Sequence, residues 1–435
     1  MTTRVSAADR TRERLEALID GRLATAPERS DLVRLAARLI LEEASEGEVR
    51  DRLGRERYQR AGGEPAGYRN GYRTGRMRTA EGMVEYAAPQ VRATAEPFAS
   101  AIREGLTGRT EALEDLAIEF YARGLSTRDI EATLTDGEGR RLLSRAAVSE
   151  ITERLWEDYA ASTGRDLGGH KIVYLYVGGI AERLRAGRPR EAVIAAWGIG
   201  EDGRKVPLHL MAGSKEDTET VRAFFQDRRG RGLGDPLLVV SDGAPGIIRA
   251  IEACFPRSAR QRCLAHRMRN LAAKVPVDLW PEFEARVTAC YRAPSRAIAR
   301  DLAAGIRADY AATVPSAVAC FEDDFEACIA HLRLPVAHRR ATRTTNLLER
   351  LFVEERRRLK IVPNGFGEKA VLKLMFAALI RAADRWRGLR FGLRFGEFEL
   401  RQIAAVREDL GAEHEATITR SDTPSQPRVS SKSTP

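Results

Sequence analysis

The spacing of apolar and polar positions divides the chain into stretches of different character. Residues 1–110 combine amphipathic helix, as in 32–43, with an irregular basic stretch over 50–79, where nine arginines stand against three acids and the glycines disfavour a compact helix. Residues 111–165 are predicted to be helical again, with capping and turn residues at the spacing of helix-turn-helix units. After Gly168 the periodicity changes to that of strands.

The helix-turn-helix prediction rests on caps and on one apolar stripe. Ser126 and Asp129 have the spacing of a capping box, in which the hydroxyl accepts the N–H of Asp129 and the carboxylate reaches back. Ser144 is expected to cap a longer helix, whose apolar stripe is Val148, Ile151, Leu155 and Tyr159. Arg145 and Arg154 lie outside this stripe, so this helix is the candidate recognition helix for a DNA groove. A merely structural helical hairpin fits the same pattern.

Strands and helices alternate in the following stretch, which predicts a mixed α/β sheet. The apolar run IVYLYV over 172–177 is typical of a strand buried on both faces. Further strands are predicted over 191–199, 205–211 and 237–240, with helices over 216–229, 247–254, 277–335, 345–360 and 368–387. The last fifteen residues, SDTPSQPRVSSKSTP, carry too little apolar surface to become ordered.

Net charge, hydropathy and cysteine content indicate which partners and which cellular compartment to expect. Lys and Arg outnumber Asp and Glu by 72 to 62, and this excess favours a polyanionic partner. No apolar run approaches the roughly 18 residues of a membrane span, and no signal peptide begins the chain, so a cytoplasmic protein without a membrane partner is expected. The five cysteines are odd in number and confined to 254–328, which does not resemble a secreted disulfide framework and predicts reduced thiols.

The basic stretch over 50–79 is a candidate for contact with nucleic acid. Arginine interleaved with tyrosine can hold phosphate with guanidinium groups and lay rings against sugar or base. The candidate side chains are Arg69, Tyr72, Arg73 and Arg76. A solvated, flexible linker is the alternative.

Asp242 is the clearest candidate for a catalytic or ligand-binding side chain in the predicted sheet. It follows the apolar run LLVV and precedes a glycine and a helix. A carboxylate there projects from the carboxyl end of a central strand, where open α/β sheets place their ligands. An aspartate at a strand end is also a common helix cap, and taken alone the local sequence favours that interpretation.

Glu349, in RTTNLLERLFVEERRRLK, is the second candidate acid. At about 100° per residue it borders a buried arc of Leu348, Leu351, Phe352 and Leu359. It shares a face with Asn346, Arg356 and Lys360. A carboxylate beside a basic ridge suits a nuclease metal site, but an ordinary surface helix held by i,i+4 ion pairs has the same pattern.

Several of these motifs, in this order, resemble the bacterial Mutator-type insertion-sequence transposases. They are VVSDGAPGI around Asp242, QRCLAHRMRNL with Cys263 and His266, TTNLLER around Glu349, and the N-terminal YRNGYRTGRMRT and GLSTRDIEATL. The resemblance spans roughly residues 40–390. It implies an α/β, RNase H-like mixed sheet with an all-α insertion, preceded by a helical, helix-turn-helix-type DNA-binding region.

The resemblance also implies a division of the chain and a chemistry. The expected regions are 1–110 and 111–165 for DNA binding, 166–276 and 341–400 for the two parts of the catalytic domain, 277–340 for the insertion, and 401–435 for the end of the C-terminal helix and a disordered tail. In an Asp, Asp, Glu triad, Asp242 would be the second acid and Glu349 the third. Two Mg²⁺ or Mn²⁺ ions about 3.5 to 4 Å apart would be the cofactors, because such hard cations prefer oxygen ligands. The expected partners are terminal inverted repeats, target DNA and further copies of the chain.

The chain departs from the family pattern at the first acid. Relatives read roughly V-D-G-I at the end of the first strand, whereas this chain reads Val177-Gly178-Gly179-Ile180, so Gly178 takes the place of the aspartate. Asp166 and Glu182 are the nearest acids, but a strand fixes side-chain direction and neither should reach the same point. We therefore expect strand cleavage and transfer to be severely impaired. The alternative function is a catalytically inactive DNA-binding repressor or inhibitor.

Cys263 and His266 form a C-x-x-H pair, a spacing that zinc sites use. Four-ligand zinc sites normally need a second pair at similar spacing, and the other candidates, Cys254 and His331, do not supply it. A structural or substrate-positioning role near the active site, as the family's equivalent motif implies, is expected instead.

Overall fold

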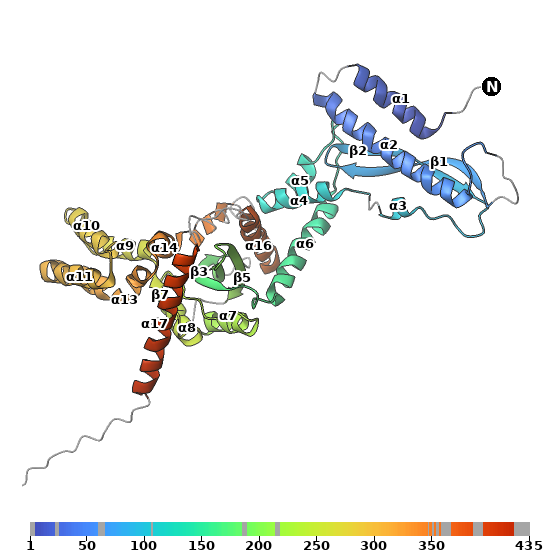
Figure 1. The fold of residues 1–435 in the computed structure, drawn as a ribbon. Coiled ribbons are helices and arrows are strands. Elements are labelled where there is room, and N and C mark those ends of the chain that lie inside the picture. Colours follow the sequence, from blue (N-terminus) through green and yellow to red (C-terminus); the bar gives the residue numbers. More distant parts are fainter. Residues whose placement is uncertain are drawn as a thin grey trace, which may run out of the picture. The chain divides into compact units, whose positions relative to one another are not determined.

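The chain folds as two compact units, Met1–Leu155 and Trp156–Pro435 (Figure 1). The computed structural model describes residues 5–21, 26–59, 66–105, 108–184, 189–213, 218–346, 348–349, 352–353, 356–357, 367–385 and 395–421. The expected disordered tail over 421–435 lies outside the described residues except for its first residue, Ser421, which ends a helix. Among the described residues, no helix is both long enough and apolar enough to span a membrane.

The first unit consists of a β-hairpin packed against helices, followed by three further helices. Its elements are α1 (Ala7–Asp20), α2 (Ala26–Leu53), β1 (Tyr68–Thr79), β2 (Gly82–Arg92), α3 (Ala101–Gly105), α4 (Glu111–Ala122), α5 (Thr127–Thr133) and the first part of α6 (Arg145–Gly164). Leu41 of α2 packs with Met77, Val84 and Tyr86 of the hairpin, and this small apolar cluster joins the helix to the two strands.

The prediction of an irregular stretch over 50–79 is wrong for its second half, which is the antiparallel strand β1. Its glycines disfavour a helix but not this strand. Gly75 lies opposite Tyr86, and a Cβ atom on Gly75 would lie 2.3 Å from the Tyr86 ring. Glycine therefore leaves the space that the ring of Tyr86 fills. The sequence pattern of this strand carries too few apolar residues to reveal it.

The caps predicted in the helical stretch are present. The Ser126 hydroxyl accepts the N–H of Asp129 at 3.1 Å, and the Asp129 carboxylate accepts the N–H of Ser126 at 3.2 Å, which is a complete capping box. The hydroxyl of Ser144 accepts the N–H of Ala147 at the start of α6. All four residues of the predicted apolar stripe of α6 are buried.

The second unit is built around a mixed five-stranded sheet in the order β5-β4-β3-β6-β7. The strands are β3 (Ile172–Glu182), β4 (Glu191–Gly200), β5 (Lys205–Gly213), β6 (Leu238–Ser241) and β7 (Ala259–Arg262). β3, β4 and β5 are antiparallel neighbours, whereas β3, β6 and β7 run parallel. The predicted strands are confirmed. β7 was not predicted, because the sequence ARQR has no apolar run.

Helices cover both faces of this sheet. On one face α7 (Thr218–Gly230) and α8 (Pro245–Cys254) pack on residues such as Leu175 and Val239. On the other face, α16 (Glu368–Arg385) and α17 (Glu397–Ser421) share a core with Tyr176 and Val240. The residues at 346, 348–349, 352–353 and 356–357, here called the Glu349 segment, are helical and contribute Leu348 and Phe352 to the same core.

The residues between α9 (Leu264–Ala272) and the Glu349 segment form a helical body with its own core. Its elements are α10 (Trp280–Tyr291), α11 (Arg296–Tyr310), α12 (Pro315–Glu322), α13 (Phe325–Cys328), the 3₁₀ helix η1 (Ala330–Arg333) and α14 (Val336–Thr342). Phe283, Tyr310 and Phe321 lie at its centre. The helical prediction for 277–335 is thus confirmed.

Candidate active site

Asp242 directly follows β6, the parallel neighbour of the strand that contains Gly178. The recorded pairing of β3 with β6 ends at Tyr176 and Val240, two residues before Gly178 and Asp242. Because side chains alternate along a strand, Gly178 faces the same side of the sheet as Tyr176. This is the face that carries the Glu349 segment.

Asp242 follows the end of β6 directly, as its position after the apolar run indicated. Its Oδ1 accepts the N–H of Ala244 at 3.0 Å, and Ala244 is the N-cap residue of α8. The carboxylate thus orders the turn into α8 without capping the helix itself. Its second oxygen has no hydrogen-bond or ion-pair partner among the described residues.

Gly178 lies in the interior of β3, so the expectation that it ends the first strand is wrong. The strand continues to Glu182 because β4 pairs with it along its whole length, with Ala195 opposite Gly178. A Cβ atom on Gly178 would lie only 2.7 Å from Cδ2 of Leu348. The space that a first acid would enter is therefore occupied by a leucine side chain, from the residue that precedes Glu349.

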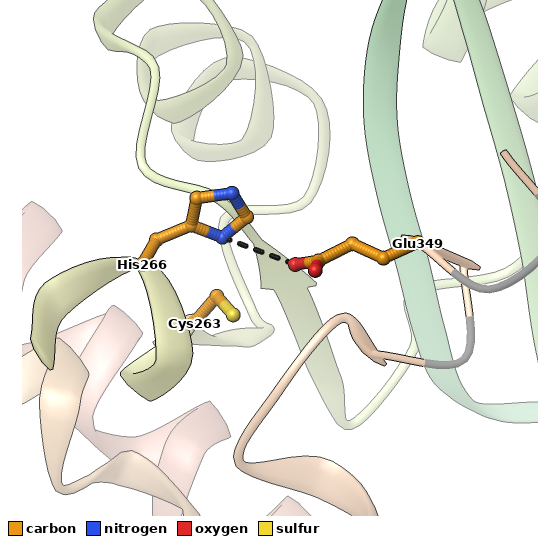
Figure 2. Close-up of side chains that lie close together, drawn as sticks. All are labelled: Cys263, His266 and Glu349. Carbon is orange, nitrogen blue, oxygen red and sulfur yellow. Dashed lines mark ion pairs between the residues drawn. The ribbon is translucent and has the colours of Figure 1, made fainter. Parts of the chain in front are cut away.

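Among the described residues, the ion pairs of Glu349 are formed with α9. Oε1 lies 3.4 Å from Nδ1 of His266 (Figure 2). Oε2 lies 3.2 Å from the Arg269 guanidinium. About a third of its side chain is exposed. These partners come from the QRCLAHRMRNL motif, so the structure unites two motifs that lie some eighty residues apart.

Cys263 lies between the end of β6 and the Glu349 segment. Its N–H donates to the carbonyl of Ser241, the residue before Asp242. Its sulfur accepts the N–H of Thr345 at 3.3 Å and lies 3.2 Å from the Thr345 hydroxyl. That hydroxyl also lies 3.2 Å from Oε1 of Glu349. Since it carries one proton, it can donate to only one of the two at a time.

The thiol and the imidazole at this place shift each other's protonation. Burial alone would raise the pKa of the Cys263 thiol, but hydrogen bonds with His266 and Thr345 outweigh burial and hold this pKa below its ordinary value. A hydrogen bond with the Cys263 sulfur raises the pKa of His266, and the nearby Glu349 carboxylate raises it further. Burial of the imidazole opposes this shift but does not cancel it. The two shifts have opposite directions because each group stabilises the charged form of the other.

The polar residues predicted to share the face of Glu349 have different surroundings. Asn346 is exposed at the start of the segment. Arg356 is half exposed and lies 3.7 Å from Glu182, near the end of β3. Lys360 lies outside the described residues. Glu182 is the last residue of β3, four positions after Gly178.

The candidate DNA-binding residues of the hairpin are only partly available to a ligand. Arg69 forms an ion pair with Glu46, and the hydroxyl of Tyr72 donates to the same carboxylate. Burial and this hydrogen bond raise the pKa of Tyr72 to about 12. Arg73 is half-buried, whereas Arg76 is 68% exposed and pairs with the carboxylate of Glu85 across the hairpin.

The two candidates on α6 also differ. Arg145 is exposed at the first turn of the helix. Arg154 forms an ion pair with Glu114 of α4 at 2.9 Å, so it has a structural contact inside the first unit. Arg145 is therefore the freer of the two for contact with a polyanion.

The sequence pattern did not reveal three features of this site. These are the contact of Leu348 with Gly178, the ion pairs of Glu349 with α9, and the hydrogen bonds from Thr345 to the Cys263 sulfur. All of them join residues that are far apart along the chain. The shared occurrence of Thr345 and Glu349 in TTNLLER is the signal that could have indicated the last one.

Comparison with known proteins assigns the chain to a family. The family described as Transposase, Mutator family, matches residues 9–388. The transposase for insertion sequence element IS6120 of Mycolicibacterium smegmatis is 31% identical over 275 residues, which cover 62% of this chain and 84% of the relative. The transposase for insertion sequence element IS406 of Burkholderia multivorans is 30% identical over 356 residues, or 81% of this chain and 90% of the relative. Because these matches cover most of its length, the chain belongs to the Mutator family of transposases.

Proposed function

We propose that this protein binds the terminal inverted repeats of an insertion sequence through its first unit and carries, on an RNase H-like second unit, the remains of a metal-dependent centre for DNA strand cleavage and transfer. The curated relatives are transposases for insertion sequence elements, which supports DNA as the substrate. The mixed sheet, with three antiparallel strands followed by two parallel ones, is compatible with the fold that the family resemblance implies.

Asp242 and Glu349 are the acids that we assign to this centre. Asp242 lies at the carboxyl end of a central parallel strand, the usual place for ligands in open α/β sheets. Glu349 is tied to Cys263 through Thr345, and Cys263 is hydrogen-bonded to the residue before Asp242. This chain of hydrogen bonds between Glu349 and the end of β6 supports the assignment of both acids to one centre.

The residues present do not fit the pair of Mg²⁺ or Mn²⁺ ions that the family implies. Such a centre needs oxygen ligands both to hold the ions and to offset their charge. Gly178 supplies no ligand atom, and a methyl group of Leu348 lies only 2.7 Å from the position that a Cβ atom would take. We therefore propose that this copy is severely impaired in strand cleavage and transfer, and the contact of Leu348 with Gly178 is the observation that carries this conclusion.

The same observation favours a second candidate function. A chain that keeps its DNA-binding unit and its contacts with other copies, but cannot cut, would act as a repressor or a dominant inhibitor of transposition. The exposed Arg76 and Arg145 of the first unit supply charge for binding to phosphate.

Binding and cleavage of the same DNA separate these functions from an active transposase. Duplexes that carry the ends of the element encoding this chain would be incubated with the protein and Mg²⁺ or Mn²⁺, with a scrambled duplex as the control. We expect specific binding without cleavage. Efficient cleavage by the unaltered chain would contradict the proposed impairment, whereas failure to prefer the ends over the scrambled duplex would contradict the proposed DNA-binding role.

A mixing experiment tests the inhibitor function directly. If Gly178→Asp restores cleavage, the unaltered chain added in excess to that variant should lower its rate through mixed assemblies. A rate that is independent of the unaltered chain would rule out dominant inhibition.

A further inference from the structure

We propose that Cys263, His266 and Glu349 form a three-ligand site for a divalent ion of the zinc class, chemically distinct from the Mg²⁺ or Mn²⁺ centre that the family implies. The site is defined by its own three residues and does not depend on whether the chain cuts DNA.

The three side chains converge from two segments far apart in the sequence. Each offers one ligand atom, and these atoms all lie within 4.8 Å of one another (Figure 2). Tetrahedral Zn²⁺ with nitrogen and oxygen bonds of about 2.0 to 2.1 Å holds these two atoms about 3.4 Å apart. Nδ1 of His266 and Oε1 of Glu349 are already separated by 3.4 Å. The other separations are at most 4.8 Å, whereas a sulfur and a nitrogen or oxygen bound to tetrahedral Zn²⁺ lie about 3.5 Å apart, so an ion requires only a small contraction of the cluster.

The third ligand removes the objection that the sequence raised against zinc. The C-x-x-H pair lacks a second Cys or His pair at similar spacing, but zinc sites with an open position use three protein ligands and can include a carboxylate. Glu349 supplies that carboxylate from a residue eighty-three positions after His266. The fourth position would be open to water or to an oxygen of another ligand.

The surroundings of the cluster prepare it for a cation. Nδ1 of His266 is buried and lies 3.4 Å from Oε1 of Glu349, and the imidazole also contacts the Cys263 sulfur. Cys263 is fully buried, and the N–H and hydroxyl of Thr345 are directed at its sulfur, so this ligand atom is held in place. Arg269 holds the other oxygen of Glu349 and so fixes the carboxylate, as residues behind a metal ligand commonly do.

The donor set selects the class of metal. One thiolate and one imidazole suit Zn²⁺ and its spectroscopic substitute Co²⁺, whereas Mg²⁺ requires oxygen ligands. Glu349 belongs both to this site and to the centre proposed for strand transfer. Occupation by zinc would therefore withdraw this carboxylate from Mg²⁺.

Titration of the metal-free, full-length chain with Co²⁺, in the absence of DNA, tests the site. A thiolate-to-cobalt charge-transfer band should develop up to one equivalent, disappear on addition of Zn²⁺, and persist in excess Mg²⁺. Cys263→Ser should abolish the band, while the matched variant Cys254→Ser, at a buried cysteine outside the cluster, should keep it.

Two further variants keep the test decisive if Cys263→Ser fails to fold. His266→Asn and Glu349→Gln alter partly exposed side chains, and each should weaken Co²⁺ binding at least about tenfold, as loss of metal-site residues commonly does. Absence of the band in the unaltered chain, its persistence in Cys263→Ser, or unchanged affinity in both other variants would overturn the proposal. Because no DNA is present, none of these results depends on the proposed strand transfer.

Discussion

The packing of Leu348 against Gly178 predicts that substitutions at these two positions are strongly coupled. A Cβ atom at 178 would lie 2.7 Å from Cδ2 of Leu348, about 1 Å closer than the 3.5 to 4.0 Å of an ordinary carbon contact. Overpacking of this kind costs about 1 to 3 kcal/mol. Alanine in a strand recovers about 0.5 to 1 kcal/mol relative to glycine. We therefore expect Gly178→Ala to lower the free energy of unfolding by about 0.5 to 2 kcal/mol.

Leu348→Ala should be costly alone and much less so beside alanine at 178. Leu348 is 2% exposed, and truncating a buried leucine costs about 2 to 5 kcal/mol. In the double variant the added Cβ enters the space that the leucine leaves. The double variant should therefore be more stable than the sum of the single effects predicts, by about 1 to 3 kcal/mol.

Urea unfolding followed by tryptophan fluorescence measures this coupling, because the fluorescence reports on the unit that contains residues 178 and 348. All four tryptophans, at 156, 197, 280 and 386, lie in Trp156–Pro435. Gly230→Ala is the matched control, because a Cβ atom there meets nothing within 4 Å and should be additive with Leu348→Ala. Additivity of the 178 and 348 substitutions within about 0.5 kcal/mol would refute the proposed contact.

Three further predictions concern other parts of the chain. Burial lowers the pKa of His209 to about 3, so the unfolded chain takes up a proton below pH 6.5 that the folded chain refuses. The free energy of unfolding should therefore fall as pH decreases from about 6.5 towards 3, by up to about 1.4 kcal/mol per pH unit from this group. His209→Gln should flatten this pH dependence, as measured by urea unfolding at several pH values. An unchanged pH dependence in His209→Gln would contradict the assigned role of His209. Arg267 is 1% exposed and donates to the carbonyls of Cys320 and Asp323, so Arg267→Met should cost about 2 to 4 kcal/mol by the same fluorescence assay, and a loss below about 1 kcal/mol would show that these bonds are dispensable. If Arg76 contacts phosphate, Arg76→Ala should reduce the slope of log affinity for DNA against log salt by about 1, whereas an unaltered slope would remove Arg76 from the interface.

The strands and helices of the second unit could largely be predicted because their apolar runs are long and clear. IVYLYV and LLVV are buried in the sheet. In the first unit, the predicted Ser126 capping box is also complete. β1 and β7 could not be predicted, since YRNGYRTGRMRT and ARQR have the composition of exposed loops and become strands only through their partners.

The candidate site shows the same division between local and long-range information. The place of Asp242 after its strand follows from local sequence, and so does the burial of Leu348 and Phe352. The ion pairs of Glu349 with α9 do not follow from local sequence, because helix periodicity indicates which face a residue lies on but not which element packs against that face. The filling of the space at Gly178 by Leu348 depends on the tertiary packing of two segments, which no spacing within one motif encodes.

Restoration of the first acid is the most direct test of the assigned strand-transfer centre. Gly178→Asp, alone and combined with Leu348→Ala to make room, would be assayed for Mg²⁺- or Mn²⁺-dependent cleavage of DNA that carries the element's ends. Gly179→Asp, whose side chain points to the opposite face of β3, is the matched control. We predict a gain of at least about 100-fold for one or both Gly178 variants, none for the control, and loss of the gain when Asp242→Asn is added, because a restored metal ligand contributes several kcal/mol to the transition state. No gain in either Gly178 variant, with the fold retained, would contradict the assignment of Gly178, Asp242 and Glu349 to one centre.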